Sequence, residues 1–329
     1  TAMTRVPRLL LNGLLSLLAL VALAAALFAY FLYTPEPELP RLSGTLSKAS
    51  MNVAGVERSY RTYVPKGLPK GAPLVLVMHG SGEGPQAIRV GTGYGFERLA
   101  DQHGFAVAYP KSFGFDWNDC SSIGNTAVDG VRADDAGFLA ALVEKLVGEI
   151  GVDPNRVFAA GVSNGGSMAL RLALEHPKRY RAVAAALANV PAPQNFQCQP
   201  GAQTPSVMIL NGTEDPLVPY AGGEINLLGL FYKGGQVISS TASAQYLADR
   251  NAIAGKPQVN LTQTAQGTRV EHARWQAADG RTEVELVTLH GAGHGLPQPW
   301  ARRPRLLGPS PMEPNGPALI WAFFERQSK

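Results

Sequence analysis

The stretch Gly161-Val162-Ser163-Asn164-Gly165 lies between an apolar, strand-like run at residues 156–161 and a helical pattern that begins at Gly166. A serine on a sharp turn from strand to helix has its hydroxyl pushed clear of its neighbours, which is the arrangement of a nucleophile elbow. The glycines two positions away on either side let strand and helix approach closely. A glycine-rich loop with an incidental serine is the alternative, but the flanking pattern favours the elbow and therefore acyl-transfer chemistry.

Apolar runs alternate with helical patterns on both sides of this elbow. The strand-like runs are residues 60–64, 74–78, 105–109, 157–161, 182–188, 207–210 and 284–289. The clearest helix comes before the elbow, where Phe138, Leu142 and Leu146 recur every four residues. The alternation predicts an α/β fold with a mostly parallel central sheet flanked by helices, in which the residues that follow the strands carry the chemistry.

A serine nucleophile needs a base and an acid that orients the base, and in α/β-hydrolases the chain order is serine, acid, histidine. Asp215 lies in an acidic turn after a strand-like run and is the preferred acid; Glu214 is the neighbouring alternative, and a solvated turn acid is another. His294 lies between glycines in a loop after the last run and is the preferred base. His290 is expected to end that strand and to make a structural hydrogen bond.

The oxyanion of the reaction requires two N–H donors, which backbone amides can supply. The amide of Asn164 directly follows the serine, and the turn His79-Gly80-Ser81-Gly82 offers a second, for which Ser81 is preferred. His79 is expected to be buried and structural. The remaining histidines are expected to lie at the surface: His103, His176 and His272.

Residues 14–33 form an apolar stretch in which only Ser16 is polar, long enough as a helix to cross roughly 30 Å of bilayer. Basic residues precede it and acidic residues follow it, which predicts a cytoplasmic N-terminus and an extracytoplasmic remainder, either membrane-anchored or secreted. Small residues at 24–26 resemble a signal-peptide cleavage site, but cleavage there would leave an apolar start, so an uncleaved anchor is favoured. The expected organisation is a helix at 1–33, a proline-rich linker at 34–50 and a catalytic domain at 51–329.

The 329 residues, with 45% hydrophobic and 16% charged content, are typical of a globular protein. The net charge is +4, and the basic residues are scattered along the chain except for Arg302, Arg303 and Arg305. We interpret this cluster as solvated surface rather than as a nucleic-acid site. Cys120 and Cys198 lack the spacing of a zinc site. They could instead form one disulfide.

Six ordered motifs resemble the family of polyhydroxybutyrate depolymerases and feruloyl esterases, which is similar to carbohydrate esterase family 1. The resemblance spans roughly residues 51–329. The motifs are Arg58-Ser59-Tyr60-Arg61-Thr62-Tyr63-Val64-Pro65, His79-Gly80-Ser81-Gly82, Trp117-Asn118-Asp119-Cys120, Gly161-Val162-Ser163-Asn164-Gly165-Gly166, Gly212-Thr213-Glu214-Asp215-Pro216-Leu217-Val218-Pro219-Tyr220 and Gly293-His294. The resemblance implies an α/β-hydrolase fold, a triad of Ser163, Asp215 and His294, and no cofactor or metal.

One departure from this family affects the expected substrate. Family members commonly carry a tryptophan two positions after the catalytic histidine, where this chain has Leu296. Trp117 and Trp300 could supply an aromatic face instead, although each is more simply explained by packing. Trp117 and Leu296 are therefore the candidate substrate-binding residues, and feruloyl specificity is not implied.

The expected activity is hydrolysis of carboxylic esters, such as polyhydroxyalkanoate oligoesters or feruloyl and acetyl esters, through an acyl-enzyme. Two alternatives stay open: an amidase or serine peptidase with the same triad, and a membrane-tethered binding protein on a hydrolase fold. The Cys120–Cys198 bridge would join two loops at one rim and close about 79 residues, for a stabilisation on the order of 4 kcal/mol.

Overall fold

A ten-stranded sheet organises the chain in this computed structural model, which describes residues 5–123, 127–128, 131–132, 134–227, 229 and 233–328. Its spatial order is β1 (Thr45–Val53), β2 (Val56–Val64), β4 (Ala106–Pro110), β3 (Leu74–Met78), β7 (Val157–Val162), β8 (Ala182–Ala186), β9 (Ser206–Gly212), β14 (Glu283–Leu289), β13 (Arg269–Gln276) and β12 (Gln258–Gln263). The strands from β4 to β14 run parallel, and an antiparallel pair extends each edge. The prediction of a mostly parallel α/β sheet is confirmed.

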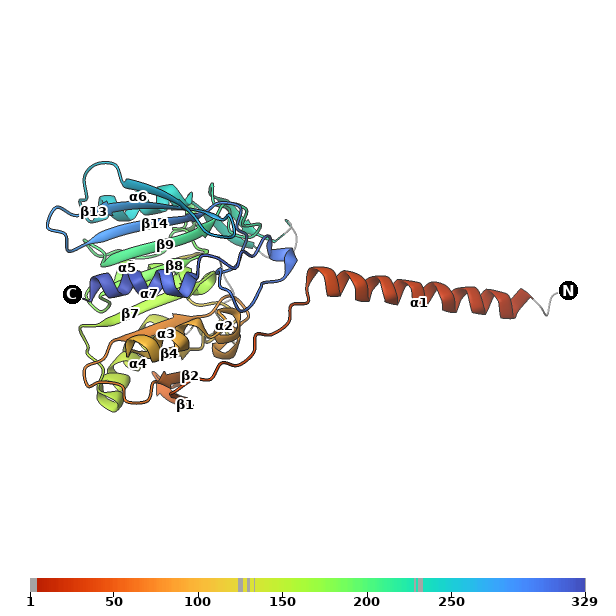
Figure 1. The fold of residues 1–329 in the computed structure, drawn as a ribbon, viewed down its shortest axis with the longest axis horizontal. Coiled ribbons are helices and arrows are strands. Elements are labelled where there is room, and N and C mark those ends of the chain that lie inside the picture. Colours follow the sequence, from red (N-terminus) through yellow and green to blue (C-terminus); the bar gives the residue numbers. More distant parts are fainter. Residues whose placement is uncertain are drawn as a thin grey trace.

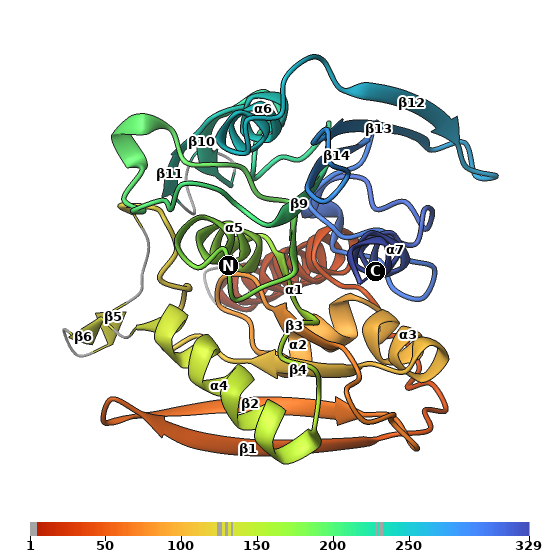
Figure 2. The ribbon, with the colours of Figure 1, turned by 90° about the vertical axis from the view of Figure 1, so that its left-hand side faces the viewer.

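Helices cover both faces of this sheet, as Figure 2 shows with the sheet seen edge-on. One face packs against α4 (Asp135–Ile150), α5 (Asn164–Glu175) and α6 (Ser240–Arg250), and the other against α2 (Pro85–Gly91), α3 (Gly95–His103) and α7 (Gly316–Gln327). The four-residue spacing seen in the sequence places Phe138, Leu142 and Leu146 of α4 in the first of these cores. Shorter elements are β5 (Ala127–Val128), β6 (Val131–Arg132), β10 (Gly223–Asn226), β11 (Lys233–Val237), η1 (Pro193–Asn195) and η2 (Arg305–Leu307).

Helix α1 (Arg5–Phe31) projects away from the domain (Figure 1). Its segment Leu10–Phe31 is 22 residues long, has none of its apolar window buried in the protein, and is long and apolar enough to cross a membrane by length and composition. The chain then returns to the sheet, where β1 begins at Thr45, inside the segment expected to be linker. Polar residues fill much of β1, so its pairing with β2 was not visible as an apolar run.

A disulfide joins Cys120 to Cys198, with their Cα atoms 4.8 Å apart and 78 residues of sequence separation. It ties the loop after β4 to the loop after η1. We expect the double variant Cys120→Ala, Cys198→Ala to lose about 4 kcal/mol of unfolding free energy, because the unfolded chain regains the freedom of the closed loop. Urea denaturation measures this loss. Two titratable thiols in denatured, unreduced wild-type protein would contradict the bridge.

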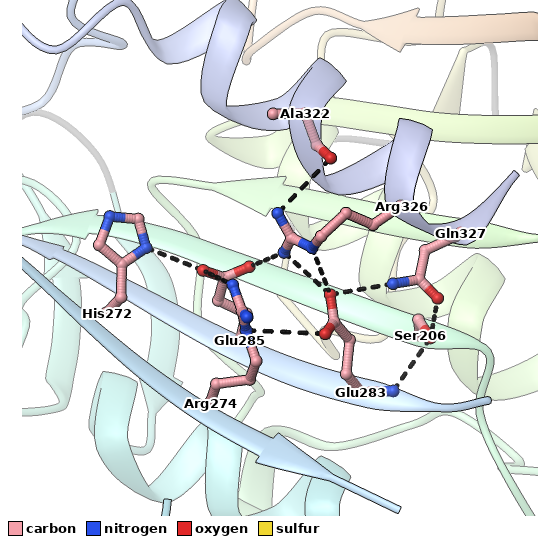
Figure 3. A network of polar contacts seen from close by, with 8 residues as sticks. All are labelled: Ser206, His272, Arg274, Glu283, Glu285, Ala322, Arg326 and Gln327. Atoms are coloured by element: carbon pink, nitrogen blue, oxygen red, sulfur yellow. Dashed lines mark hydrogen bonds and ion pairs between the residues drawn. The ribbon is translucent and has the colours of Figure 1, made fainter. Parts of the chain in front are cut away.

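The C-terminal helix is held to the sheet by a cluster of charges (Figure 3). Glu285 on β14 is 1% exposed and accepts hydrogen bonds from Arg326 of α7 and Arg274 of β13. His272 Nδ1 lies 2.8 Å from Glu285 Oε1. The assignment of His272 to the open surface is corrected, since its side chain is only 23% exposed and faces a buried carboxylate.

This cluster makes stability depend on acid pH. Burial opposes ionisation of Glu285, but the hydrogen bond with His272 and the charges of Arg326 and Arg274 lower its pKa to about 2. A depressed pKa contributes stability above the unfolded value near 4.5 that is lost as the pH falls toward 2, on the order of 3 kcal/mol. We expect Glu285→Gln to be less stable at pH 7 and to lose this pH dependence in urea denaturation. The exposed Glu144, replaced by Gln, is the matched control and should change stability by less than about 1 kcal/mol.

Candidate active site

Ser163 occupies the turn between β7 and α5 in a backbone conformation that few residues adopt, with φ 58° and ψ −125°. Strain of this kind costs on the order of 1 to 3 kcal/mol and persists where the surrounding structure enforces it. Here the enforcing contacts come from glycines: a Cβ at Gly161 would overlap the carbonyl of Gly165, and one at Gly165 would overlap the carbonyls of Met78 and His79. The elbow geometry expected from the sequence is therefore present at Ser163.

A chain of short contacts links Ser163 to His294 and Asp215. His294 Nε2 lies 2.9 Å from Ser163 Oγ, and His294 Nδ1 lies 2.7 Å from Asp215 Oδ2. Asp215 and His294 are buried, at 2% and 5% exposure of their side chains. The other oxygen of Asp215 accepts hydrogen bonds from the amides of Leu217 and Val218, both at 2.8 Å. The neighbouring Glu214 is exposed, so the structure brings Asp215, and not Glu214, to the histidine.

The turn after β3 lies beside the serine. Gly80 is so near that an added Cβ would stand 3.5 Å from the Cβ of Ser163, and Ser81 lines the same pocket. On the other side, Asn164 is the first residue of α5, and a first-turn amide has no acceptor within its own helix. Asn164 and Ser81 thus lie in the two turns that border Ser163.

A half-buried ion pair that the sequence did not reveal supports the turn after β3. Glu83 accepts a hydrogen bond from the amide of Gly80 at 3.2 Å and one from Arg303 at 2.7 Å. Burial opposes ionisation of Glu83, but the charge and hydrogen bond of Arg303 leave its pKa below the ordinary value. The interpretation of Arg303 as solvated surface is thus wrong: it joins the histidine loop to the turn of Ser81.

His79 is fully buried, as expected. Its Nδ1 lies 2.8 Å from the carbonyl oxygen of Gly80, and the amide of Ser112 donates to its Nε2 at 3.1 Å. Burial lowers the pKa of His79, which favours the neutral ring. His79 therefore holds the turn in place and does not face the pocket.

A pocket of about 220 Å³ opens over Ser163. Most of its wall is apolar, and it includes Val162, Leu187, Leu217, Val218, Ile225, Leu227, Val237 and Leu307. The candidate substrate-binding residues Trp117 and Leu296 are not part of this wall. Trp117 is fully buried, and its indole N–H donates to the carbonyl of His79. Leu296 packs in the core at 4% exposure beside Gly316. Trp300 instead stacks under the guanidinium of Arg98.

Asp119 also lines the pocket, a position that the motif Trp117-Asn118-Asp119-Cys120 did not indicate. Its carboxylate accepts a hydrogen bond from the side chain of Asn164 at 3.0 Å and one from the amide of Ser121 at 2.7 Å. Burial raises the pKa of Asp119 to about 7, with a contribution from nearby Asp116 and against the hydrogen bond from Ser121. The pocket therefore gains a negative charge as the pH rises through neutrality.

This charge predicts a pH-dependent preference between substrates. We expect the KM of an ester with a free carboxylate, such as p-nitrophenyl hemisuccinate, to rise about fivefold relative to that of p-nitrophenyl butyrate between pH 6 and 8, because nearby like charges repel. The ratio of the two KM values cancels pH effects that the two substrates share. Asp119→Asn should make the ratio independent of pH. A flat ratio in the wild type, or an unchanged slope in the variant, contradicts the prediction.

Among the described residues, no group of three histidine, cysteine, aspartate or glutamate side chains is placed to hold a metal ion. Instead, the site is an array of a strained serine, a histidine and a carboxylate beside two amide-bearing turns. Such an array is suited to nucleophilic attack on a carbonyl carbon.

The comparisons with known proteins agree with this chemistry. Residues 58–192 match the family model described as "Esterase PHB depolymerase". The chain is 30% identical to a putative esterase, NocK, of Nocardia uniformis subsp. tsuyamanensis over 274 residues, which cover 80% of this chain and 78% of that protein. It is 25% identical to poly(3-hydroxyalkanoate) depolymerase C of Paucimonas lemoignei, covering 71% of this chain and 58% of the depolymerase.

Among solved structures, the acetyl xylan esterase from Aspergillus awamori superimposes with a TM-score of 0.54. The match covers 77% of this chain and 95% of that one at 18% identity, which supports the hydrolase fold alone. The two relatives, by contrast, are similar over 80% and 71% of this chain. The chain belongs to the polyhydroxybutyrate depolymerase family of esterases, and it is a serine ester hydrolase.

Proposed function

We propose that the protein hydrolyses carboxylic esters with Ser163 as nucleophile, His294 as base and Asp215 as the acid that orients the base. The observation that carries the proposal is the continuous chain from Asp215 through His294 to Ser163, with contacts of 2.7 and 2.9 Å. In this arrangement Asp215 accepts a hydrogen bond from the Nδ1–H of His294, so the ring proton stays on Nδ1 and Nε2 is free to accept the proton of Ser163.

Hydrolysis then proceeds in two halves. Ser163 Oγ bonds to the ester carbonyl carbon as its proton passes to His294, and the amides of Asn164 and Ser81 stabilise the oxyanion. The C–O bond to the alcohol breaks as His294 returns the proton to the leaving oxygen, so an acyl-enzyme remains. Water attacks the acyl carbon as His294 takes its proton. The bond between the acyl carbon and Ser163 Oγ then breaks as His294 returns the proton to Oγ, and the acid is released.

The apolar pocket wall favours binding of esters that have an apolar acyl or alcohol part. Oligomeric polyesters are one class of such substrates. Feruloyl esters are less well supported, because both tryptophans considered for stacking a ring lie outside the pocket wall. Rates on p-nitrophenyl esters of increasing chain length test this preference. A maximum at acetate with no activity on longer chains would contradict an apolar acyl subsite.

The bond type is tested with matched substrates. We expect p-nitrophenyl butyrate to be cleaved and butyryl p-nitroanilide to be cleaved far more slowly, since the amide is the less reactive acyl group. A preparation active only on the anilide would favour the amidase alternative. A preparation inactive on both, yet able to bind the ester, would favour the non-catalytic binding protein.

We further propose that the catalytic domain lies outside the cytoplasm, with the apolar helix α1 retained as an anchor. Because β1 belongs to the central sheet, the domain begins at Thr45 rather than at residue 51, and the linker is the segment between α1 and β1. The disulfide supports an oxidising compartment, and the length and apolar surface of Leu10–Phe31 support membrane insertion. The intact mass of protein extracted from membranes distinguishes a retained helix from a cleaved one. A mass that lacks the apolar helix would contradict the anchor.

A further inference from the structure

The short helix η2 connects α1 to the candidate active site. At one end, the guanidinium of Arg305 lies 4.3 Å from the ring centroid of Tyr30, in the last turn of α1. At the other end, Leu307 lines the catalytic pocket, and its carbonyl accepts a hydrogen bond from the amide of His294 at 2.6 Å. Three residues therefore span from the apolar helix to the catalytic histidine.

The linker after α1 lies against the same loop. Residues 34–37 and residues 301–304 line one surface hollow, and Arg303 lines both this hollow and the catalytic pocket. In Figure 1, α1 leaves the domain beside the blue segment that contains η2. The apolar helix thus departs from the edge of the sheet where β7, β9 and β14 end and the pocket opens.

Exposed apolar side chains lie at this edge as well. Ile123, 47% exposed, lines the pocket, and Phe115, 50% exposed, covers Gly82 in the turn that carries Ser81. The exposed charges nearby are mixed in sign, with Arg302 and Arg305 against Glu36, Glu38 and Glu214, while Glu83 is paired with Arg303. Apolar contact and the position of α1, rather than net charge, distinguish this edge.

We propose that the catalytic pocket faces the membrane that α1 enters and takes acyl esters dissolved in that bilayer. A helix of 22 residues spans about 33 Å, the thickness of a hydrocarbon core, which places Tyr30 and Tyr33 at the interface where tyrosines are enriched. The contact of Arg305 with Tyr30 then holds η2 at head-group level, with the pocket wall directly behind it. Phe115 and Ile123 add exposed apolar surface beside the pocket, and the apolar wall accepts the chain of a lipid ester.

The orientation is independent of catalysis and is tested first. The full-length protein is reconstituted in phosphatidylcholine vesicles that contain lipids with a nitroxide on the head group. A fluorophore is attached to a single added cysteine, either Phe115→Cys near the pocket or Val259→Cys on β12; both native cysteines are bridged, so the added thiol is the reactive one. Val259 is 60% exposed and is the matched control.

We expect the label at 115 to be quenched at least threefold more strongly than the label at 259. Arg302→Cys and Arg281→Cys provide a second pair of exposed positions, so the test does not depend on how well the Phe115 variant folds. Arg281 lies in the turn between β13 and β14, at the opposite end of the strands. Equal quenching at the near and far positions overturns the proposal.

The substrate class rests on the proposed ester hydrolysis and is tested by access. A fluorogenic long-chain diacylglycerol is placed in the vesicles that hold the protein, or in separate vesicles, with p-nitrophenyl acetate in solution as the reference. We expect the diacylglycerol to be cleaved at least tenfold faster in the shared vesicles, p-nitrophenyl acetate to be cleaved equally in both arrangements, and Ser163→Ala to cleave neither.

Equal or faster cleavage in separate vesicles, or no cleavage of the diacylglycerol while the acetate is hydrolysed, overturns the inference and leaves the esterase mechanism intact. Failure of the wild type to cleave both p-nitrophenyl acetate and p-nitrophenyl butyrate refutes the proposed function instead. Even then, the quenching measurement still decides which way the pocket faces.

Discussion

Replacement of Ser163 by alanine is expected to lower kcat on p-nitrophenyl butyrate by about 10⁶-fold, the order of loss known for serine hydrolases without their nucleophile. Alanine retains a Cβ at the same strained φ of 58°, so the elbow and the protein's stability should change little. The pocket and both oxyanion amides remain, so KM should change little as well. Steady-state kinetics with the purified variant measure the loss, and mass spectrometry after treatment with a fluorophosphonate locates the reactive hydroxyl.

Ser167 provides the matched control for this prediction. It lines the same pocket one turn further along α5, and its hydroxyl interacts with Asp119 rather than with His294. Ser167→Ala should lower kcat by less than about tenfold, and the phosphonate should remain on Ser163. An active Ser163→Ala variant, or an equal loss in Ser167→Ala, would show that the elbow does not supply the nucleophile.

The geometry around Ser163 could be predicted because each part is local. Ser163, Asp215 and His294 each follow a strand on a turn rich in glycine or acidic residues, and parallel strands bring such turns to one edge of the sheet. The seven predicted strand-like runs are all strands of the central sheet. The missed strands lie toward its edges: all of β12 is exposed, and Val259 and Leu261 are its only apolar residues, so no apolar run marks it.

Contacts across long sequence separations could not be predicted in this way. Arg303 pairs with Glu83 across 220 residues, and Asn164 binds Asp119 across 45. No local pattern indicates either pair, because a charged residue in a loop is predicted to be solvated unless its partner is known. The prediction that Trp117 binds substrate was wrong for the same reason: its indole N–H bonds to the carbonyl of His79, 38 residues away, and no local pattern indicates this contact.

Replacement of Asp215 by asparagine is expected to lower kcat by about 10⁴-fold, because it would hold the histidine in the wrong tautomer. The amides of Leu217 and Val218 both donate to Asp215 Oδ1 at 2.8 Å, so an asparagine must keep its oxygen at that position. Its NH₂ group would then face His294 Nδ1 as a donor. Nδ1 would have to accept, the ring proton would move to Nε2, and Nε2 could no longer take the proton of Ser163.

The adjacent carboxylate makes this prediction discriminating. Glu214 is exposed, whereas Asp215 is buried against His294, so Glu214→Gln should change kcat by less than about twofold although it removes the same charge one residue away. Long-range electrostatics from a solvated turn acid would affect both variants alike, since water and salt screen exposed charges. A large loss confined to Asp215→Asn therefore identifies a hydrogen bond that sets the tautomer. The reverse result, with Glu214→Gln inactive and Asp215→Asn active, would mean that the acidic turn rearranges during catalysis and that Glu214 is the acid.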